Sequence, residues 1–141
     1  MDIPLKYGML RANQSSGQPF HPATHLNNQS QYNTMPSYRV KITVQKKVDP
    51  AVIFDGKVPN QPGTDHPYPI CPIDENAEWI VEKNGNMPEG FCSWAWRDLY
   101  KDLAVLRFGG NFESWVTPPY MYTACSDGVR PVSFKLEVLK D

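Results

Sequence analysis

The sequence predicts a small α+β domain: an antiparallel or mixed sheet of about four strands with one amphipathic helix packed on a face. Three observations predict this class. Apolar and polar residues alternate in several short stretches, as expected of strands with one buried face. One longer stretch repeats its apolar residues at helical spacing. The order strand, long loop, strand, helix, strand, strand favours a helix segregated to one face of the sheet.

The first expected strand starts at Tyr38. The other three occupy residues 77–82, 120–125 and 132–139. Their alternation places apolar side chains on one face and charged or hydroxyl side chains on the other. Turn residues at 126–128 separate the last two strands. The alternating apolar positions are Val40, Ile42, Val44, Trp79, Val81, Val132, Phe134, Leu136 and Val138.

The helix is expected over about residues 93–108, and Gly109-Gly110 supplies its left-handed termination. Apolar residues recur at intervals of three and four, which places them on one face. The predicted buried face is Cys92, Trp96, Leu99, Leu103 and Leu106. The predicted solvated face is Arg97, Asp98, Lys101 and Asp102.

Two segments lack these periodicities. Residues 1–37 are rich in Asn, Gln, Ser, Gly and Pro, which predicts a flexible N-terminal tail before a single domain at 38–141. An alternative makes the apolar residues at 5–10 an anchor for a partner subunit. Residues 55–72 carry five prolines, which exclude regular structure and predict a long loop that covers a site.

Composition argues against several classes of protein. A net charge of −1 without a basic patch argues against a nucleic-acid binder. The apolar runs are far shorter than the ~20 residues that cross a bilayer, and no leader pattern opens the chain. We therefore expect a cytoplasmic protein that does not enter a membrane. In a reducing compartment its three cysteines are thiols, metal ligands or core residues.

Cys92 and Cys125 are the strongest candidates for chemistry. Cys92 stands at the start of the expected helix, where free backbone amides and the helix dipole favour a thiolate. Cys125 ends a strand, a position from which functional side chains are often presented. Asp127 can orient a base or cap the turn, and Arg130 can hold an anion or form an ion pair within the turn. The alternative for both cysteines is an ordinary buried position.

Cys71 ends the proline-rich loop, five residues after His66. Together with Cys92 and Cys125 these residues would form a chemically reasonable zinc or iron site. No close Cys-x₂₋₄-Cys pair exists to support it, so we expect no metal or other cofactor.

Aromatic residues near the helix start suggest a ligand pocket. We predict that Trp94, Phe91 and Trp115 wall a site for a small molecule. Peripheral core packing is the alternative for Trp94. Glu89, in the turn before Cys92, is a further candidate acid or base.

Three strings carry a family resemblance: MPEGFCSWAW at 87–96, FGG at 108–110 and CSDGVRPVSFKLE at 125–137. Together with Cys71-Pro72 they resemble a functionally uncharacterised family of small three-cysteine proteins, over about residues 38–141. Members often carry two adjacent cysteines before the turn, whereas this chain has Ala124-Cys125, which excludes a mechanism that needs a vicinal pair there. The chain is also similar to small fungal proteins encoded with the biosynthesis of gliotoxin-type, sulfur-bridged diketopiperazines. That resemblance implies work on a dithiol or disulfide natural product.

We therefore expect a thiol-dependent small-molecule enzyme of specialised metabolism that rearranges or transfers sulfur in a disulfide. Cys92 would attack and Cys125 would resolve the mixed disulfide. Two alternatives stay open: a zinc, iron or small-ligand binding protein without thiol chemistry, and a non-catalytic assembly partner of a biosynthetic enzyme. A homo-oligomer, or a partner protein from the same pathway, is compatible with each of these.

Overall fold

The computed structural model describes residues 35–140, which belong to one compact unit. The expectations for the tail and its apolar anchor concern residues 1–37 and fall almost entirely outside the described residues. The elements, in chain order, are β1 (Arg39–Lys47), α1 (Pro50–Ile53), β2 (Glu78–Val81), α2 (Ser93–Arg107), β3 (Tyr120–Ala124) and β4 (Val132–Leu139).

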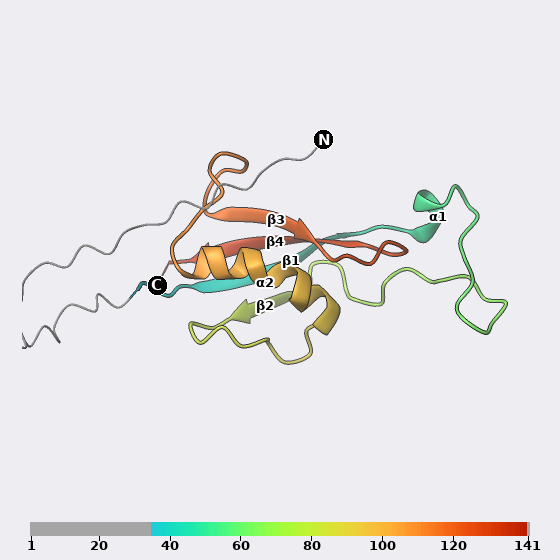
Figure 1. The fold of residues 1–141 in the computed structure, drawn as a ribbon, viewed down its shortest axis with the longest axis horizontal. Coiled ribbons are helices and arrows are strands. Elements are labelled where there is room, and N and C mark those ends of the chain that lie inside the picture. Colours follow the sequence, from blue (N-terminus) through green and yellow to red (C-terminus); the bar gives the residue numbers. More distant parts are fainter. Residues whose placement is uncertain (1–34, 141) are drawn as a thin grey trace, which may run out of the picture. The chain divides into compact units, whose positions relative to one another are not determined.

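The strands form one four-stranded sheet in the order β2-β1-β4-β3, and every neighbouring pair is antiparallel (Figure 1). The predicted α+β class is confirmed, with an antiparallel rather than a mixed sheet. The two central strands, β1 and β4, come from opposite ends of the described chain. Ile42 in β1 lies opposite Trp79 of β2 on one side and Leu136 of β4 on the other.

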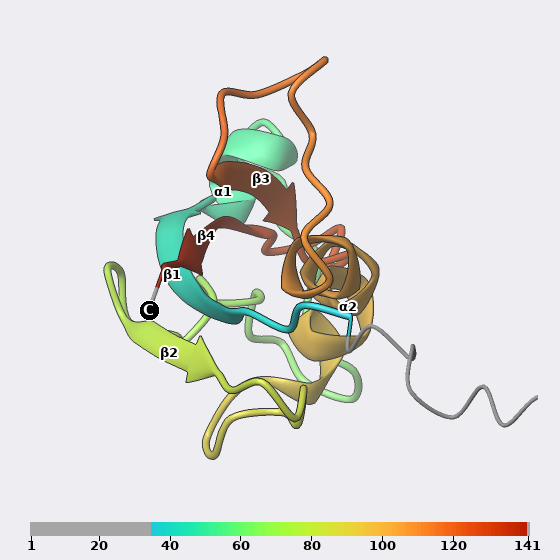
Figure 2. The same cartoon turned by 90° about the vertical axis from the view of Figure 1, so that its left-hand side faces the viewer.

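The hydrophobic core lies between α2 and one face of this sheet. Figure 2 shows α2 on a single side of the strands. Leu99, Leu103 and Leu106 of α2 are buried, as the helical spacing predicts. The sheet contributes the alternating residues of the central strands together with Val81 and Met121. Burial of these side chains is the main favourable term in the stability of the domain.

Trp96, on the expected buried face, and Asp98, on the expected solvated face, are both half-buried. Two positions differ more from the sequence-based expectation. Cys92 is not the first residue of the buried face: it is the exposed N-cap residue, with extended backbone geometry. Asp102 was assigned to the solvated face but is buried, and its carboxylate accepts a hydrogen bond at 3.0 Å from Lys101 Nζ. The ammonium of the long lysine side chain balances the buried charge of Asp102.

The connection from β1 to β2 is more ordered than expected. It begins with α1, whose first turn is capped by Asp49 through a 2.8 Å hydrogen bond from the Ala51 amide. The proline-rich loop follows, and an isolated β-bridge between Asn60 and Pro67 closes it on itself. The prolines exclude a full strand there, but they permit this single bridge. No helix among residues 35–140 has the length and apolar character needed to cross a membrane.

Candidate functional site

One cavity of about 660 Å³ gathers all three cysteines of the chain. Cys71 reaches it from the end of the proline-rich loop, Cys92 from the N-terminus of α2, and Cys125 from the residue after β3. None of the three forms a disulfide. We call this the cysteine cavity. The sequence did not show whether the cysteines meet, and in the folded chain all three line this one cavity.

Cys92 is the most accessible of the three thiols. Its residue is exposed, whereas Cys71 and Cys125 are half-buried. As N-cap residue of α2 it precedes the first-turn amides, but its side chain makes no capping hydrogen bond to them. An exposed cysteine can meet a reagent that enters from solvent, which favours Cys92 over the two half-buried cysteines.

Cys125 is held in place by the strand pair that it follows. Its amide donates to the Val132 carbonyl at 3.1 Å, and the Val132 amide donates to the Cys125 Sγ at 3.2 Å. The sulfur thus takes the acceptor position that a backbone carbonyl would fill in a continued ladder. This contact fixes the position of the sulfur at the end of the strand pair.

Asp127 organises the loop between β3 and β4. Its Oδ1 accepts hydrogen bonds from the amides of Val129 at 3.0 Å and Arg130 at 3.2 Å, and its Oδ2 accepts one from Arg130 Nε at 3.2 Å. Desolvation acts to raise the pKa of Asp127, but these hydrogen bonds outweigh it and lower the pKa. Asp127 and Arg130 both line the cysteine cavity. Of the two roles predicted for Asp127, turn capping is observed. Of the two predicted for Arg130, the ion pair within the turn is observed.

A second aspartate fastens the same loop to α2. Asp98 Oδ2 accepts a hydrogen bond from the Ser126 amide at 2.7 Å, and Arg97 Nη2 donates to both Asp98 Oδ1 and Ser126 Oγ. The backbone and side chain of Ser126, and then Arg97, lower the pKa of Asp98 against the cost of desolvation. Asp98 therefore fixes the residue that directly follows Cys125. The helical pattern alone assigned it to the solvated face and missed this role.

The remaining wall of the cysteine cavity is mostly apolar. Trp94 stands at its edge, 65% exposed, with the Arg97 guanidinium 4.5 Å from the centre of its ring. The Arg130 guanidinium lies 5.7 Å from the ring of Tyr68, which also lines the cavity. These cation–π contacts restrain both rings. Apolar lining that the sequence did not single out includes Tyr68, Ile73, Val129, Val132 and Phe134.

Four predicted site residues lie elsewhere. Phe91 is 5% exposed and packs edge-on against Trp79, Trp96 and Phe134, so it belongs to the core rather than to a pocket wall. Trp115 is 70% exposed in the loop between α2 and β3 and does not line the cavity. Glu89 and His66 are exposed and outside the lining as well. Residue type and position in the sequence could not show that Trp94 lines the cavity whereas these four residues do not.

The alternative of a metal site finds no support in the geometry. Among residues 35–140, no group of three or more His, Cys, Asp or Glu side chains is arranged to hold an ion. Sharing one cavity of this size does not bring Cys71, Cys92 and Cys125 to coordination distance of a common point.

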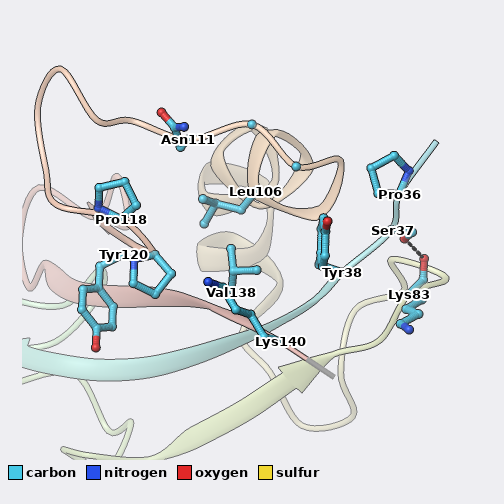
Figure 3. Close-up of a pocket in the computed structure, with 13 residues that line it drawn as sticks. Pro36, Ser37, Tyr38, Lys83, Leu106, Asn111, Pro118, Tyr120, Val138 and Lys140 are labelled. Carbon is cyan, nitrogen blue, oxygen red and sulfur yellow. Dashed lines mark hydrogen bonds between the residues drawn. The ribbon is translucent and has the colours of Figure 1, made fainter.

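A second cavity, of about 560 Å³, lies at the other end of α2 and is drawn in Figure 3. Tyr38, Leu106, Pro118, Tyr120 and Val138 form its apolar wall, and Lys83 and Lys140 contribute the charged side chains. Its described lining contains no Cys, His, Asp or Glu residue. We call it the second cavity. It therefore lacks a nucleophilic thiol and a carboxylate or imidazole base.

A comparison of the chain with protein families, curated proteins and solved structures finds no match. The family resemblance carried by the sequence motifs therefore stays a prediction. The chemistry of the cysteine cavity has to be inferred from its own residues.

Proposed function

We propose that the protein is a thiol-dependent enzyme that binds a small organic disulfide in the cysteine cavity and exchanges its sulfur bonds. One observation carries the proposal: the three cysteines, which come from three separate segments, line a single cavity of about 660 Å³. A cavity of ~300–1,000 Å³ is the usual size for a small-molecule site. Thiol–disulfide exchange needs an accessible attacking thiol and a second thiol at the same site.

The exposure of the thiols supports an order of steps. The Cys92 thiolate attacks one sulfur of the substrate disulfide; that bond breaks, a Cys92–substrate disulfide forms, and the other substrate sulfur leaves as a thiolate. Attack on the mixed disulfide by a different substrate thiolate restores Cys92 and gives a rearranged disulfide with no net oxidation.

Attack by Cys125 on the Cys92 sulfur instead gives a Cys92–Cys125 disulfide and releases the remaining substrate sulfur as a thiolate, so a cyclic disulfide leaves as a dithiol and a linear one as two thiols. Two electrons then pass from the two cysteines to the substrate, and an external dithiol has to reduce the protein before the next turnover. The hydrogen bond from the Val132 amide supports this resolving role, because it holds the Cys125 sulfur in place in the cavity that Cys92 also lines.

The setting of the reaction is part of the proposal. Reduced thiols require a reducing compartment, which fits a cytoplasmic enzyme. The motif resemblance favours a disulfide natural product of fungal specialised metabolism as the substrate class. The apolar wall of the cavity is consistent with such a molecule.

Trapping of the mixed disulfide tests the proposal. The probe is bis(2-hydroxyethyl) disulfide, a neutral linear disulfide, and peptide mapping by mass spectrometry locates the product. We expect the wild-type protein to form a Cys92–Cys125 disulfide and Cys125→Ser to accumulate the hydroxyethylthio adduct on Cys92. Cys92→Ser should lose this reactivity, whereas Lys140→Ala, in the second cavity, should retain it. Equal reaction rates of Cys92→Ser and the wild-type protein would overturn the proposal.

A further inference from the structure

The cysteine cavity contains charged groups, but none that is free for a ligand. Among its lining residues the charged side chains are Asp127 and Arg130, and they hydrogen-bond to each other at 3.2 Å. Asp127 also accepts from two backbone amides, and the guanidinium of Arg130 faces the ring of Tyr68. Their charges cancel within the cavity wall.

A further cation, Arg97, is paired as well. Arg97 stacks on Trp94 at the edge of the cavity and donates to Asp98 Oδ1 at 3.2 Å. Its Nη2 also donates to Ser126 Oγ at 3.0 Å. The arginine thus orients the Trp94 ring without presenting a free positive charge to a ligand.

We propose that the cysteine cavity selects a neutral, ring-bearing molecule and discriminates against anionic and cationic ones. A charged ligand group would lose its hydration on entry and find no unpaired carboxylate, guanidinium or ammonium group among the described lining residues, which is unfavourable. A ring would replace water on the apolar wall and against Trp94. Tripeptide thiols of the glutathione type and their disulfides, which carry two carboxylates for each ammonium group, are therefore poor ligands. This specificity deepens the proposed function by naming the class of substrate that the same site accepts.

The test uses ligands that contain no sulfur, so that binding is separated from thiol exchange. 1-Naphthaleneacetamide and 1-naphthaleneacetate share a ring and differ in charge, and calorimetry measures their affinities for the wild-type protein. Protection of the cysteines from iodoacetamide shows that binding occurs in the cysteine cavity. We expect the amide to bind at least about tenfold more tightly than the acetate, because the carboxylate is desolvated without a partner.

Two variants should each weaken the discrimination against one sign of charge. Asp127→Asn keeps an oxygen for the Val129 and Arg130 amides but leaves the Arg130 guanidinium without its anionic partner. It should raise the affinity for the acetate about tenfold and change that for the amide less than about twofold. Arg130→Gln should instead raise the affinity for 1-naphthylmethylammonium. Asp65→Asn, an exposed position outside the lining, is the matched control for a lost negative charge.

Acetate binding as tight as amide binding in the wild-type protein would overturn the inference, as would failure to bind the amide at millimolar concentration. Unchanged affinities for both charged ligands in the two variants would overturn it as well. A different result would refute the proposed function alone: the wild-type protein shows no disulfide exchange but still prefers the neutral ligand. The inferred specificity would then stand.

Discussion

The cysteine cavity and the second cavity lie at opposite ends of α2 and β4. Cys92 and Trp94 at the start of the helix line the first, and Leu106 near its end lines the second. Their volumes, about 660 and 560 Å³, do not distinguish them. The side chains do, because one cavity collects three thiols and a paired aspartate and arginine, while the other presents prolines, tyrosines and two lysines.

This difference teaches that reactive groups, not cavity size, identify the candidate site. Both cavities rest on the same apolar core, so that core sets the geometry of each. The loop after β3 belongs to the cysteine cavity alone, and two aspartates hold it. Changes in the core should therefore affect both cavities, and changes in the loop only one.

The largest effect is expected from Leu103→Ala. Leu103 is 1% exposed in the middle of α2, between the two cavities. Its truncation should lower the free energy of unfolding by ~2–5 kcal/mol through lost burial and cavity formation. Val105→Ala, two residues on and 40% exposed, should cost below ~0.5 kcal/mol. Chemical denaturation measures both, and equal losses would mean that the buried face of α2 is misassigned.

A smaller effect, confined to the cysteine cavity, is expected from Trp94→Ala. Loss of the ring should weaken binding of 1-naphthaleneacetamide about tenfold, because a stacking surface disappears. Trp115→Ala is a matched control, since Trp115 is equally exposed but lies outside both cavities. Calorimetry compares the two variants. A similar loss of affinity in both would place the ligand elsewhere.

Asp98→Asn is expected to act on one cysteine. Weakening the charged hydrogen bond to the Ser126 amide should let the loop open more often and raise the alkylation rate of Cys125 about two- to fivefold. Cys71, on a different loop, serves as the internal control. Mass spectrometry of iodoacetamide-treated protein gives both rates. Parallel acceleration of the two cysteines would point to general unfolding instead.

The same aspartate predicts a pH dependence of stability. The pKa of Asp98 is lowered in the folded protein, so its stabilising contribution is present above the ordinary aspartate pKa of ~3.9 and is lost as pH falls through the folded value. The difference in melting temperature between the wild-type protein and Asp98→Asn should therefore be largest near neutral pH and shrink in acid. Thermal melts at several pH values measure it. A difference that grows in acid would contradict the assigned direction.

Much of the fold could be predicted from the sequence, because periodicity reports which side chains are buried. Val40, Ile42 and Val44 marked β1, and Leu99 and Leu103 marked α2. Spacing cannot report which polar residue meets a distant loop. The spacing assigned Asp98 to the solvated face, but in the fold its carboxylate meets the Ser126 amide, 28 positions later in the sequence.

The candidate site could be predicted in part. Cys71, Cys92, Cys125 and Trp94 were singled out by residue type and position, and all of them line one cavity. Phe91 was assigned to the wall because it neighbours Cys92, yet it points into the aromatic core. Adjacent residues at a helix start face different ways, and only the packed structure separates core from wall.

Joint protection of the cysteines by a ligand shows whether they share one site. The wild-type protein is alkylated with iodoacetamide at increasing 1-naphthaleneacetamide, and the rate at Cys71, Cys92 and Cys125 is followed separately. Because all three line the same cavity, the account predicts that the ligand slows all three with one common midpoint, and that Cys92 is the fastest in its absence. Protection of a single cysteine, or separate midpoints for the three, would contradict a shared site.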